Sequence, residues 1–206
     1  MSQDELGLTK DNAAMLLIDH QVGLLTCVDT IDPTNLKNNI LALAKLSKIF
    51  DLPTVLTTSG ATATPNGPLM PELVEMFPQN EIIDRTLINC WHDPAFVSAV
   101  EQTGRKKLIM AAISTDVCLA FPAISAVKAG YDVYAVVDAS GTWDSLSETA
   151  AITRMAHAGV NIVGWVAAAA ELQADWARPT ANEFGMHLGT AMGGYSLLAQ
   201  YYYSQQ

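Results

Sequence analysis

The sequence predicts an α/β fold in which helices cover both faces of a parallel sheet. Short apolar runs alternate with longer segments of helical periodicity over residues 13–176. Repeated alternation of this kind is typical of strand–helix–strand units, whose parallel strands are buried on both sides. The chain has 206 residues, which is long enough for one such domain with a complete core and short for two.

Six segments have the composition of strands. Residues 13–18 form an unbroken apolar run that ends at Asp19, which favours a strand buried on both faces. Residues 54–58 are rich in β-branched side chains, and residues 81–84 form a short strand at best. The remaining strands are expected at residues 108–113, 133–137 and 160–163.

Helix boundaries are marked by acidic residues, proline and glycine. Asp32-Pro33 and Asp93-Pro94 each predict a helix start, and Gly104 predicts the end of the second of these helices. Ser145 and Glu148 have the spacing of a capping box for a later helix, which is expected to stop at Gly159. Helices are also expected over residues 118–130 and 164–176.

Composition and charge exclude several classes of function. The formal charge is −10, and the largest basic cluster is residues 105–107, just before a predicted strand, so we expect no nucleic-acid partner. No apolar run is long enough to span a bilayer, so we expect no membrane partner. Cys27, Cys90 and Cys118 have neither paired nor metal-binding spacing, and Met1–Glu5 has no signal-peptide pattern. We therefore expect a reduced, cytoplasmic protein.

The end of the chain differs from the repeating units before it. We interpret residues 1–178 as the α/β domain and residues 179–206 as a C-terminal oligomerisation arm that packs on a neighbouring subunit. The reason is that the segment follows the last complete strand–helix unit and is rich in glycine and aromatic residues. The alternative is a tail that lies on its own domain. The tyrosines of residues 179–206 are Tyr195, Tyr201, Tyr202 and Tyr203.

One cysteine stands where a strand is expected to turn into a helix. The apolar run 108–113 stops at Ser114-Thr115, and the helical pattern begins around Cys118. The first turn of a helix has outward-pointing N–H groups and the positive end of the dipole, which favour a thiolate. Because thiolates are nucleophiles, Cys118 is a candidate catalytic residue. The alternative for Cys118 is a buried small apolar residue without a catalytic role. We interpret Cys27 and Cys90 as structural.

Two further polar residues follow predicted strands. Asp19 comes after the first strand and Arg85 after the third, and the carboxyl ends of parallel strands meet at one edge of a sheet. Asp19 can take a proton from Cys118 and later return it to a leaving amine. Arg85 can hold Asp19 ionised, and two backbone N–H groups at the helix start can receive an oxyanion. The alternatives are a turn-capping role for Asp19 and an exposed loop position for Arg85.

Other catalytic and cofactor motifs are absent from the sequence. It contains no dinucleotide fingerprint, no phosphate-binding loop and no GxSxG motif. Asp19 and His20 are adjacent, so in a strand their side chains would point to opposite faces. His92, His157 and His187 have no ligand spacing. We therefore expect no cofactor and no metal site.

Several segments together resemble the isochorismatase-like cysteine hydrolases and, within them, the YcaC-like subgroup. Residues 13–21 resemble the family's first strand, and residues 85–91 resemble its Lys-x-x-x-Ser-Ala-Phe segment. Residues 112–119 resemble its Gly-x-x-Thr-x-x-Cys-Val nucleophile turn. The similarity covers about residues 8–178 and includes residues 121–123, 138–141, 154–159, 165 and 171–176.

The resemblance implies a three-layer α/β/α (Rossmann-like) fold with a six-stranded parallel sheet. It implies that Cys118 is the nucleophile and Asp19 the proton carrier, and it places Arg85 at the position of the family's lysine. Arg85 keeps the charge but cannot share a proton as lysine can. The family often has a cis peptide beside this turn, here Ile113-Ser114, which would direct the N–H groups of Ser114 and Cys118 at the oxyanion.

The resemblance also bears on metal binding and assembly. Ser59 stands where the metal-binding nicotinamidases have histidine, so their metal site is not matched. YcaC-like proteins are often octamers, which implies a homo-oligomer, a tetramer or an octamer, for this chain.

The function we expect is hydrolysis of the C–N bond of a small amide through a thioester on Cys118. The partner is then a small-molecule substrate, and Asn89 and Trp91 are candidate substrate-binding residues. Two alternatives stay open. One is a thiol-based sensor or binding scaffold without turnover. The other is hydrolysis of a vinyl ether of the isochorismate type, which needs no cysteine nucleophile.

Overall fold

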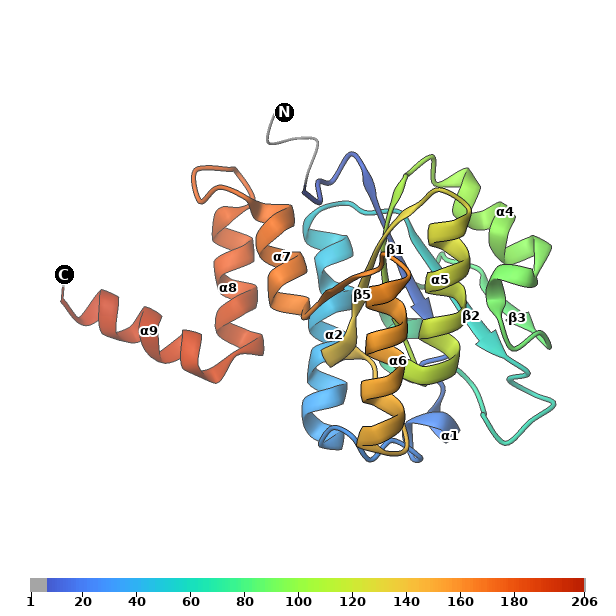
Figure 1. Cartoon of the computed structure of the whole chain (residues 1–206). Helices are drawn as coiled ribbons and strands as arrows, with labels where there is room; N and C mark the ends of the chain where they lie inside the picture. Colours follow the sequence, from blue (N-terminus) through green and yellow to red (C-terminus); the bar gives the residue numbers. More distant parts are fainter. Residues whose placement is uncertain (1–6, 206) are drawn as a thin grey trace.

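The structure is a computed structural model that describes residues 7–205. In these residues, six parallel strands form one sheet (Figure 1). The segment Met1–Glu5, in which we expect no signal peptide, lies outside these residues. The strand order is β3-β2-β1-β4-β5-β6, and every neighbouring pair is parallel. The strands are β1 (Ala13–Ile18), β2 (Thr54–Ser59), β3 (Ile82–Arg85), β4 (Lys107–Ala112), β5 (Asp132–Val136) and β6 (Asn161–Val163).

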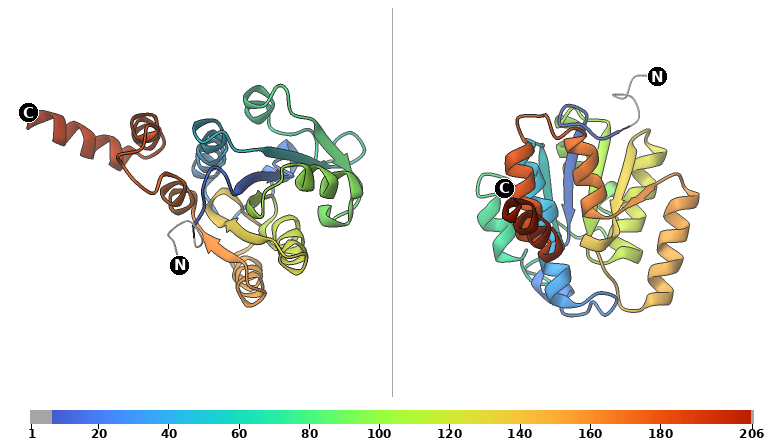
Figure 2. Two further views of the ribbon diagram at one scale, coloured as in Figure 1. Left: turned by 90° about the horizontal axis from the view of Figure 1, so that it is seen from above. Right: turned by 90° about the vertical axis from the view of Figure 1, so that its left-hand side faces the viewer.

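Strands β1 and β4 lie at the centre of the sheet, and all six residues of β1 are buried. Alternate side chains of β1 enter two different apolar clusters, because successive side chains of a strand point to opposite faces. Met15 and Leu17 pack in the cluster that contains α2, α7 and α8, whereas Leu16 and Ile18 pack in the cluster that contains α4, α5 and α6. The sheet is therefore the middle layer of three, as Figure 2 shows, and the predicted α/β/α fold is confirmed.

Helices connect the carboxyl end of each strand to the amino end of the next. Asp32 and Asp93 cap α2 and α4 by accepting backbone N–H groups of the first turn, as predicted. The regular helices are α1 (Val22–Leu25), α2 (Pro33–Ile49), α3 (Pro71–Met76), α4 (Pro94–Gln102), α5 (Ala120–Lys128), α6 (Ser145–His157), α7 (Trp165–Gln173), α8 (Ala181–Ala191) and α9 (Gly193–Ser204). Short 3-10 turns are η2 (Cys90–His92) and η4 (Val137–Ala139), and a π turn, η3 (Thr115–Leu119), precedes α5.

The predicted capping box at the start of α6 is wrong. The cap is Asp144, whose carboxylate accepts the Ser147 N–H at 2.9 Å. Glu148 instead accepts a hydrogen bond from Thr30 Oγ1 at 3.1 Å. The Glu148 carboxylate thus bonds to Thr30, far away in the sequence, and does not bond to the start of its own helix as the spacing suggested.

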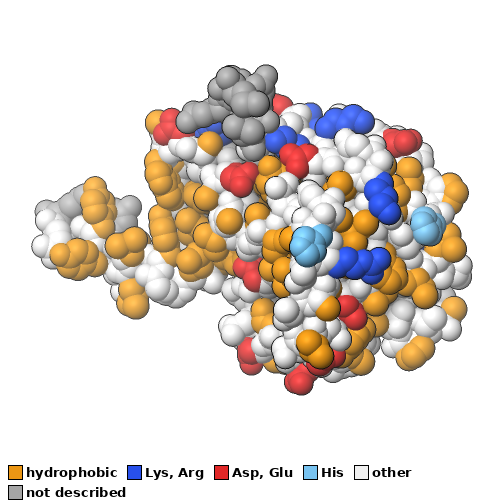
Figure 3. All heavy atoms as spheres, in the orientation of Figure 1, with side chains coloured by type: hydrophobic (Ala, Val, Ile, Leu, Met, Phe, Trp, Pro, Cys, Tyr) orange, Lys and Arg blue, Asp and Glu red, His pale blue; other side chains and the backbone are white. Residues whose placement is uncertain are grey.

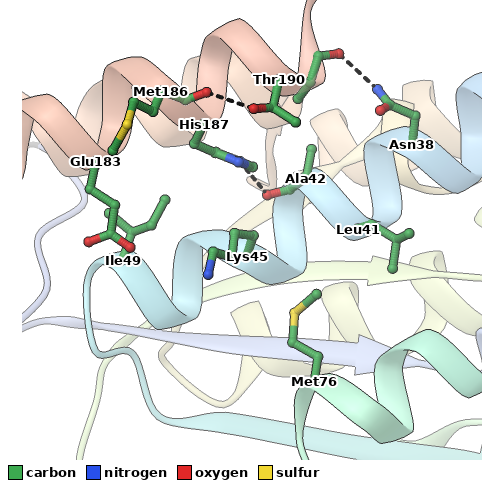
Figure 4. Close-up of a pocket in the computed structure, with 11 residues that line it drawn as sticks. Asn38, Leu41, Ala42, Lys45, Ile49, Met76, Glu183, Met186, His187 and Thr190 are labelled. Atoms are coloured by element: carbon green, nitrogen blue, oxygen red, sulfur yellow. Dashed lines mark hydrogen bonds between the residues drawn. The ribbon is translucent and has the colours of Figure 1, made fainter.

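The C-terminal segment contains two helices with different surroundings. Helix α8 packs on α2, where the His187 Nε2–H donates to Ala42 O at 2.9 Å and Asn38 Nδ2 donates to Ala191 O at 3.0 Å (Figure 4). Phe184 and Leu188 of α8 are buried in the adjoining core. Helix α9 instead projects from the body (Figures 1 and 2) and exposes Leu197, Leu198, Tyr201 and Tyr202, whereas the side chain of Tyr203 lies outside the described residues. Among the described residues, no helix is long and apolar enough to cross a membrane.

We propose that α9 is the part of the predicted oligomerisation arm that holds subunits together. Deleting residues 193–206 should lower the mass of the assembly in size-exclusion light scattering, because the exposed apolar side chains of α9 would no longer bury themselves against another subunit. Circular dichroism should show a retained fold, since α8 keeps its contacts with α2. Deleting only residues 205–206 is the control, and an unchanged mass without α9 would contradict the proposal.

Candidate active site

A buried ion pair joins the carboxyl ends of β1 and β3. Arg85 Nη2 lies 2.6 Å from Asp19 Oδ2, and neither side chain is exposed (0% for both). Asp19 has a φ of 58°, a left-handed conformation that is uncommon outside glycine. Its N–H donates to Thr57 O at 3.0 Å, and its carbonyl accepts the Gln21 N–H at 2.7 Å. The turn after β1 is therefore held at both ends while the carboxylate points toward Arg85.

The guanidinium of Arg85 also holds the chain that follows β3. Its Nη1 donates to the carbonyl oxygens of Leu87 and of Ile88, the latter at 3.2 Å. The backbone of Arg85 is also bonded to the loop after β2, because its carbonyl oxygen accepts the Gly60 N–H at 2.8 Å. Arg85 thus fixes two neighbouring loops relative to Asp19, and it is not the exposed loop residue of the alternative interpretation.

Cys118 lies on the π turn η3, directly before α5. This turn is held to the sheet, because the Thr115 N–H donates to Gly141 O at 3.0 Å and the Leu119 N–H donates to Ser114 O at 2.9 Å. The peptide bond between Ile113 and Ser114 is cis. Residue Cys118 is partly exposed, and its largely buried thiol interacts with the carboxylate of Asp19 and with the backbone N–H of Ser114. The structure therefore brings Asp19, Arg85 and Cys118 together at one edge of the sheet.

The resting Cys118 is a neutral thiol. Burial raises its pKa above the ordinary value, and the negative charge of Asp19 raises it further. The Ser114 N–H and the Arg85 charge lower it, but their effect is smaller. The raised pKa runs against the expectation of a thiolate stabilised by the helix start, because desolvation and the neighbouring carboxylate both favour the neutral thiol.

Asp19 is the natural proton acceptor for this thiol. Burial raises the pKa of Asp19 above its ordinary value, although the Arg85 charge and the hydrogen bonds from Cys118 and Arg85 oppose the shift. Asp19 Oδ1 has no hydrogen-bond partner among the described residues, and the Cys118 thiol lies close enough to the carboxylate to influence its pKa. A buried carboxylate with a raised pKa is a stronger base than an exposed one.

Polar residues outside the sequence prediction hold the nucleophile turn. Thr142 Oγ1 donates to Asp116 Oδ1 at 2.7 Å, and Thr115 Oγ1 donates to Glu148 Oε1 at 3.4 Å. Glu148 also binds Thr30, so one carboxylate joins η3, α6 and the loop after β1. No local motif announces these contacts, since the partners lie far apart in the sequence.

The two candidate substrate-binding residues follow the loop that Arg85 holds, and both make contacts that stabilise the fold. Asn89 caps η2 by accepting the Trp91 N–H at 3.1 Å, and its Nδ2 donates to Ser125 Oγ at 3.1 Å. Trp91 packs edge-on against Phe96 and Tyr131. Their role in binding substrate stays a prediction.

The histidine next to Asp19 points elsewhere. The His20 ring is fully buried, and its Nε2–H donates to Ala139 O at 3.1 Å, on the β5 side of the site. Burial lowers the pKa of His20 to about 4, so the ring is neutral. Over residues 7–205, no group of three or more His, Cys, Asp or Glu side chains could hold a metal ion.

The model of the isochorismatase domain matches residues 13–167. The chain therefore belongs to the isochorismatase family of hydrolases, and its similarity to YcaC proteins places it in the YcaC subgroup. It is 49% identical over 177 residues to "Probable hydrolase YcaC" of Escherichia coli (strain K12), with 85% of each chain covered.

Solved structures agree with this assignment. The E. coli YcaC structure, described as an octameric hydrolase of unknown specificity, has a TM-score of 0.93 and 44% identity, with 98% of each chain covered. YcaC from Pseudomonas aeruginosa, with hexane-2,5-diol and covalent acrylamide, has a TM-score of 0.92 and 46% identity, covering 96% of this chain and 97% of that one. A nicotinamidase from Bacillus subtilis shares only the fold, at 14% identity and a TM-score of 0.64, covering 74% of this chain and 99% of that one.

The buried ion pair should contribute to stability in a pH-dependent way. Replacing Arg85 by Met leaves the Asp19 carboxylate buried without a cation, which should lower the free energy of unfolding at pH 7 by about 3–5 kcal/mol. In this variant the folded-state pKa of Asp19 rises further above the unfolded value. The native state then binds the proton more tightly than the unfolded state, so stability should fall as pH rises from about 4 to 7.

Urea unfolding between pH 4 and pH 8 measures this effect. The double variant Asp19→Asn/Arg85→Met is the control, because without the carboxylate the added pH dependence should disappear. An equal loss of stability at every pH in Arg85→Met would contradict the electrostatic explanation.

Alkylation should report the raised pKa of the Cys118 thiol. Labelling of Cys118 by iodoacetamide, followed by mass spectrometry, should have its midpoint above the pH of about 8.5 that is typical of a free thiol. Asp19→Asn removes the negative charge and should move the midpoint to lower pH. Fast labelling of Cys118 well below pH 8 in the unchanged protein would show that the thiolate is the resting form.

Proposed function

We propose that the protein is a cysteine-dependent hydrolase of small amides that acts through a thioester on Cys118. The observation that carries the proposal is that the Cys118 thiol lies beside a buried carboxylate that is itself paired with Arg85. A neutral thiol beside a base can attack a carbonyl carbon as its proton leaves. The C–N specificity follows from the same pair, because Asp19 can return that proton to a leaving nitrogen.

The first half of the reaction makes the thioester. Asp19 takes the Cys118 proton as Sγ bonds to the carbonyl carbon, and the carbonyl oxygen becomes an oxyanion near the backbone N–H groups of Ser114 and Cys118. The oxyanion collapses, the C–N bond breaks, and Asp19 gives the proton to the departing nitrogen. Ammonia or an amine leaves.

The second half returns the enzyme to its resting state. Asp19 takes a proton from water as the water oxygen attacks the thioester carbon. The C–S bond then breaks, the carboxylic acid is released, and Sγ regains its proton from Asp19. Arg85 stays hydrogen-bonded to Asp19 and to the loop after β3, so it positions the carboxylate throughout.

The relatives support a reactive nucleophile. The P. aeruginosa YcaC structure contains covalent acrylamide, an amide with an electrophilic double bond that soft nucleophiles attack. We expect the same reactivity from Cys118. The octameric state of E. coli YcaC likewise supports a homo-oligomer for this chain.

Ammonia release from a panel of small primary amides tests the proposal. Cys118→Ala should abolish turnover, and Asp19→Asn should lower kcat by about 10²–10⁴ fold, because the proton carrier is lost. Intact-protein mass spectrometry of rapidly quenched reactions should show the acylated enzyme only when Cys118 is present.

The two alternatives give different results in the same experiments. A sensor or scaffold would react once per subunit and release no further ammonia. A vinyl-ether hydrolase would turn over isochorismate in the unchanged protein and in Cys118→Ala alike. Either result would overturn the thioester mechanism.

A further inference from the structure

Few cations lie at the edge of the sheet that carries Cys118. The segments that join the carboxyl end of each strand to the next helix contain no lysine or arginine. They are residues 19–32, 60–70, 86–93, 113–119, 137–144 and 164, and their acidic residues are Asp19, Asp29, Asp32, Asp93, Asp116, Asp138 and Asp144.

Basic residues gather at the opposite edge and along the outer helices. Lys10, Arg105 and Lys106 precede strands, and Lys128 and Arg154 lie in the last turns of α5 and α6. On the face shown in Figure 3, Lys and Arg side chains lie over the upper and middle part of the body, while the lower edge, where α1 follows β1 in Figure 1, shows acidic and apolar side chains.

Arg85 and Lys37, which lie near the site edge, each have an acidic partner, and the Arg154 guanidinium lies over the ring of Phe121, three residues after Cys118. Arg85 has no exposed side-chain surface and donates to Asp19, Leu87 and Ile88. Lys37, near the start of α2, forms an ion pair with Glu72 of α3. Arg85 is therefore not free to bind a carboxylate or phosphate of a substrate, and the exposed Lys37 ammonium already faces Glu72.

Four helix starts at this edge, those of α2, α4, α6 and α7, are occupied by carboxylates, whereas η3 and α5 beside Cys118 have no side-chain cap. A helix N-terminus attracts anions through its unpaired N–H groups and its dipole. Here Asp32, Asp93 and Asp144 accept those N–H groups in α2, α4 and α6, and Asp138 Oδ1 accepts the Trp165 N–H of α7 at 2.8 Å. The chain's own carboxylates thus take the positions that an anionic ligand would use.

Apolar side chains are exposed on both sides of the catalytic group. Leu87 and Ile88 are exposed, and their carbonyls bind the guanidinium that holds Asp19. Trp143 is exposed next to Thr142, whose hydroxyl binds Asp116 on the π turn of Cys118. Exposed Leu146 follows on the first turn of α6.

We infer that the substrate is an amide without a negative charge whose acyl side carries an apolar group. The inference rests on the proposed function and adds the substrate class to it. An anionic substrate would enter a region of negative potential and lose its hydration without gaining a cation. An apolar acyl group would instead cover exposed side chains such as Ile88 and Trp143.

Three amides of matched size separate charge from shape. They are 4-methylpentanamide, succinamide and succinamate, in which an isopropyl, a carboxamide or a carboxylate group stands at the same place. We expect kcat/KM to be highest for 4-methylpentanamide, lower for succinamide and at least about a hundredfold lower for succinamate. Equal or better hydrolysis of succinamate would overturn the inference.

A second measurement does not depend on turnover. Iodoacetamide and iodoacetate are similar in size and differ in charge, so their rates at Cys118 report the potential at the thiol. With N-acetylcysteinamide as the reference thiol, the iodoacetate-to-iodoacetamide ratio should be at least about tenfold lower at Cys118. A ratio equal to that of the reference would overturn the inference. If no amide is hydrolysed, the proposed function fails, and the alkylation ratio still decides the charge selectivity.

A single added cation provides the matched variant. Ile88 is 62% exposed beside the site, and Met186 is 60% exposed on α8, so lysine is tolerated sterically at both. Ile88→Lys should raise the relative iodoacetate rate and the relative kcat/KM for succinamate about tenfold, because it supplies the missing cation. Met186→Lys adds the same net charge away from the site and should change neither. Equal effects of the two variants would contradict selection by local charge.

Discussion

The ion pair between Asp19 and Arg85 is the constraint on which the site depends. Strand β2 lies between β1 and β3, so Arg85 reaches past one strand to meet the carboxylate. Neither charge can remain buried alone, because the cost of removing an unpaired ion from water is several kcal/mol. The pair therefore ties the left-handed turn at Asp19 to the loop of Leu87 and Ile88, and in the proposed mechanism it supplies the base.

Burial also decides the protonation state of the nucleophile. The thiol and the carboxylate share a poorly hydrated space in which each raises the free energy of the other's negative charge. The pair then holds the proton of Cys118 until a carbonyl carbon is available. This differs from cysteine sites that rest as a thiolate, and it suits an uncharged substrate that can enter a low-dielectric site without losing strong hydration.

The same aspartates serve the fold and shape the field at the site. Asp32, Asp93 and Asp144 each satisfy N–H groups at a helix start, which stabilises the helix locally. Because all the helices between parallel strands begin at the carboxyl edge, these carboxylates accumulate there. The topology of the sheet in this way links helix capping to the exclusion of anionic ligands that we propose.

The sequence by itself determined the layered fold, the positions of the strands to within a residue or two, and the edge at which Asp19, Arg85 and Cys118 meet. These follow from local periodicity, from caps such as Asp93-Pro94, and from the rule that parallel strands end together. Only the tertiary structure decided that Cys118 is neutral, that Glu148 joins Thr30 and Thr115 and does not cap its own helix, and that α8 packs on α2 while α9 projects. Each of these findings depends on burial or on contacts between distant segments. Burial and distant contacts are not encoded in the spacing of neighbouring residues.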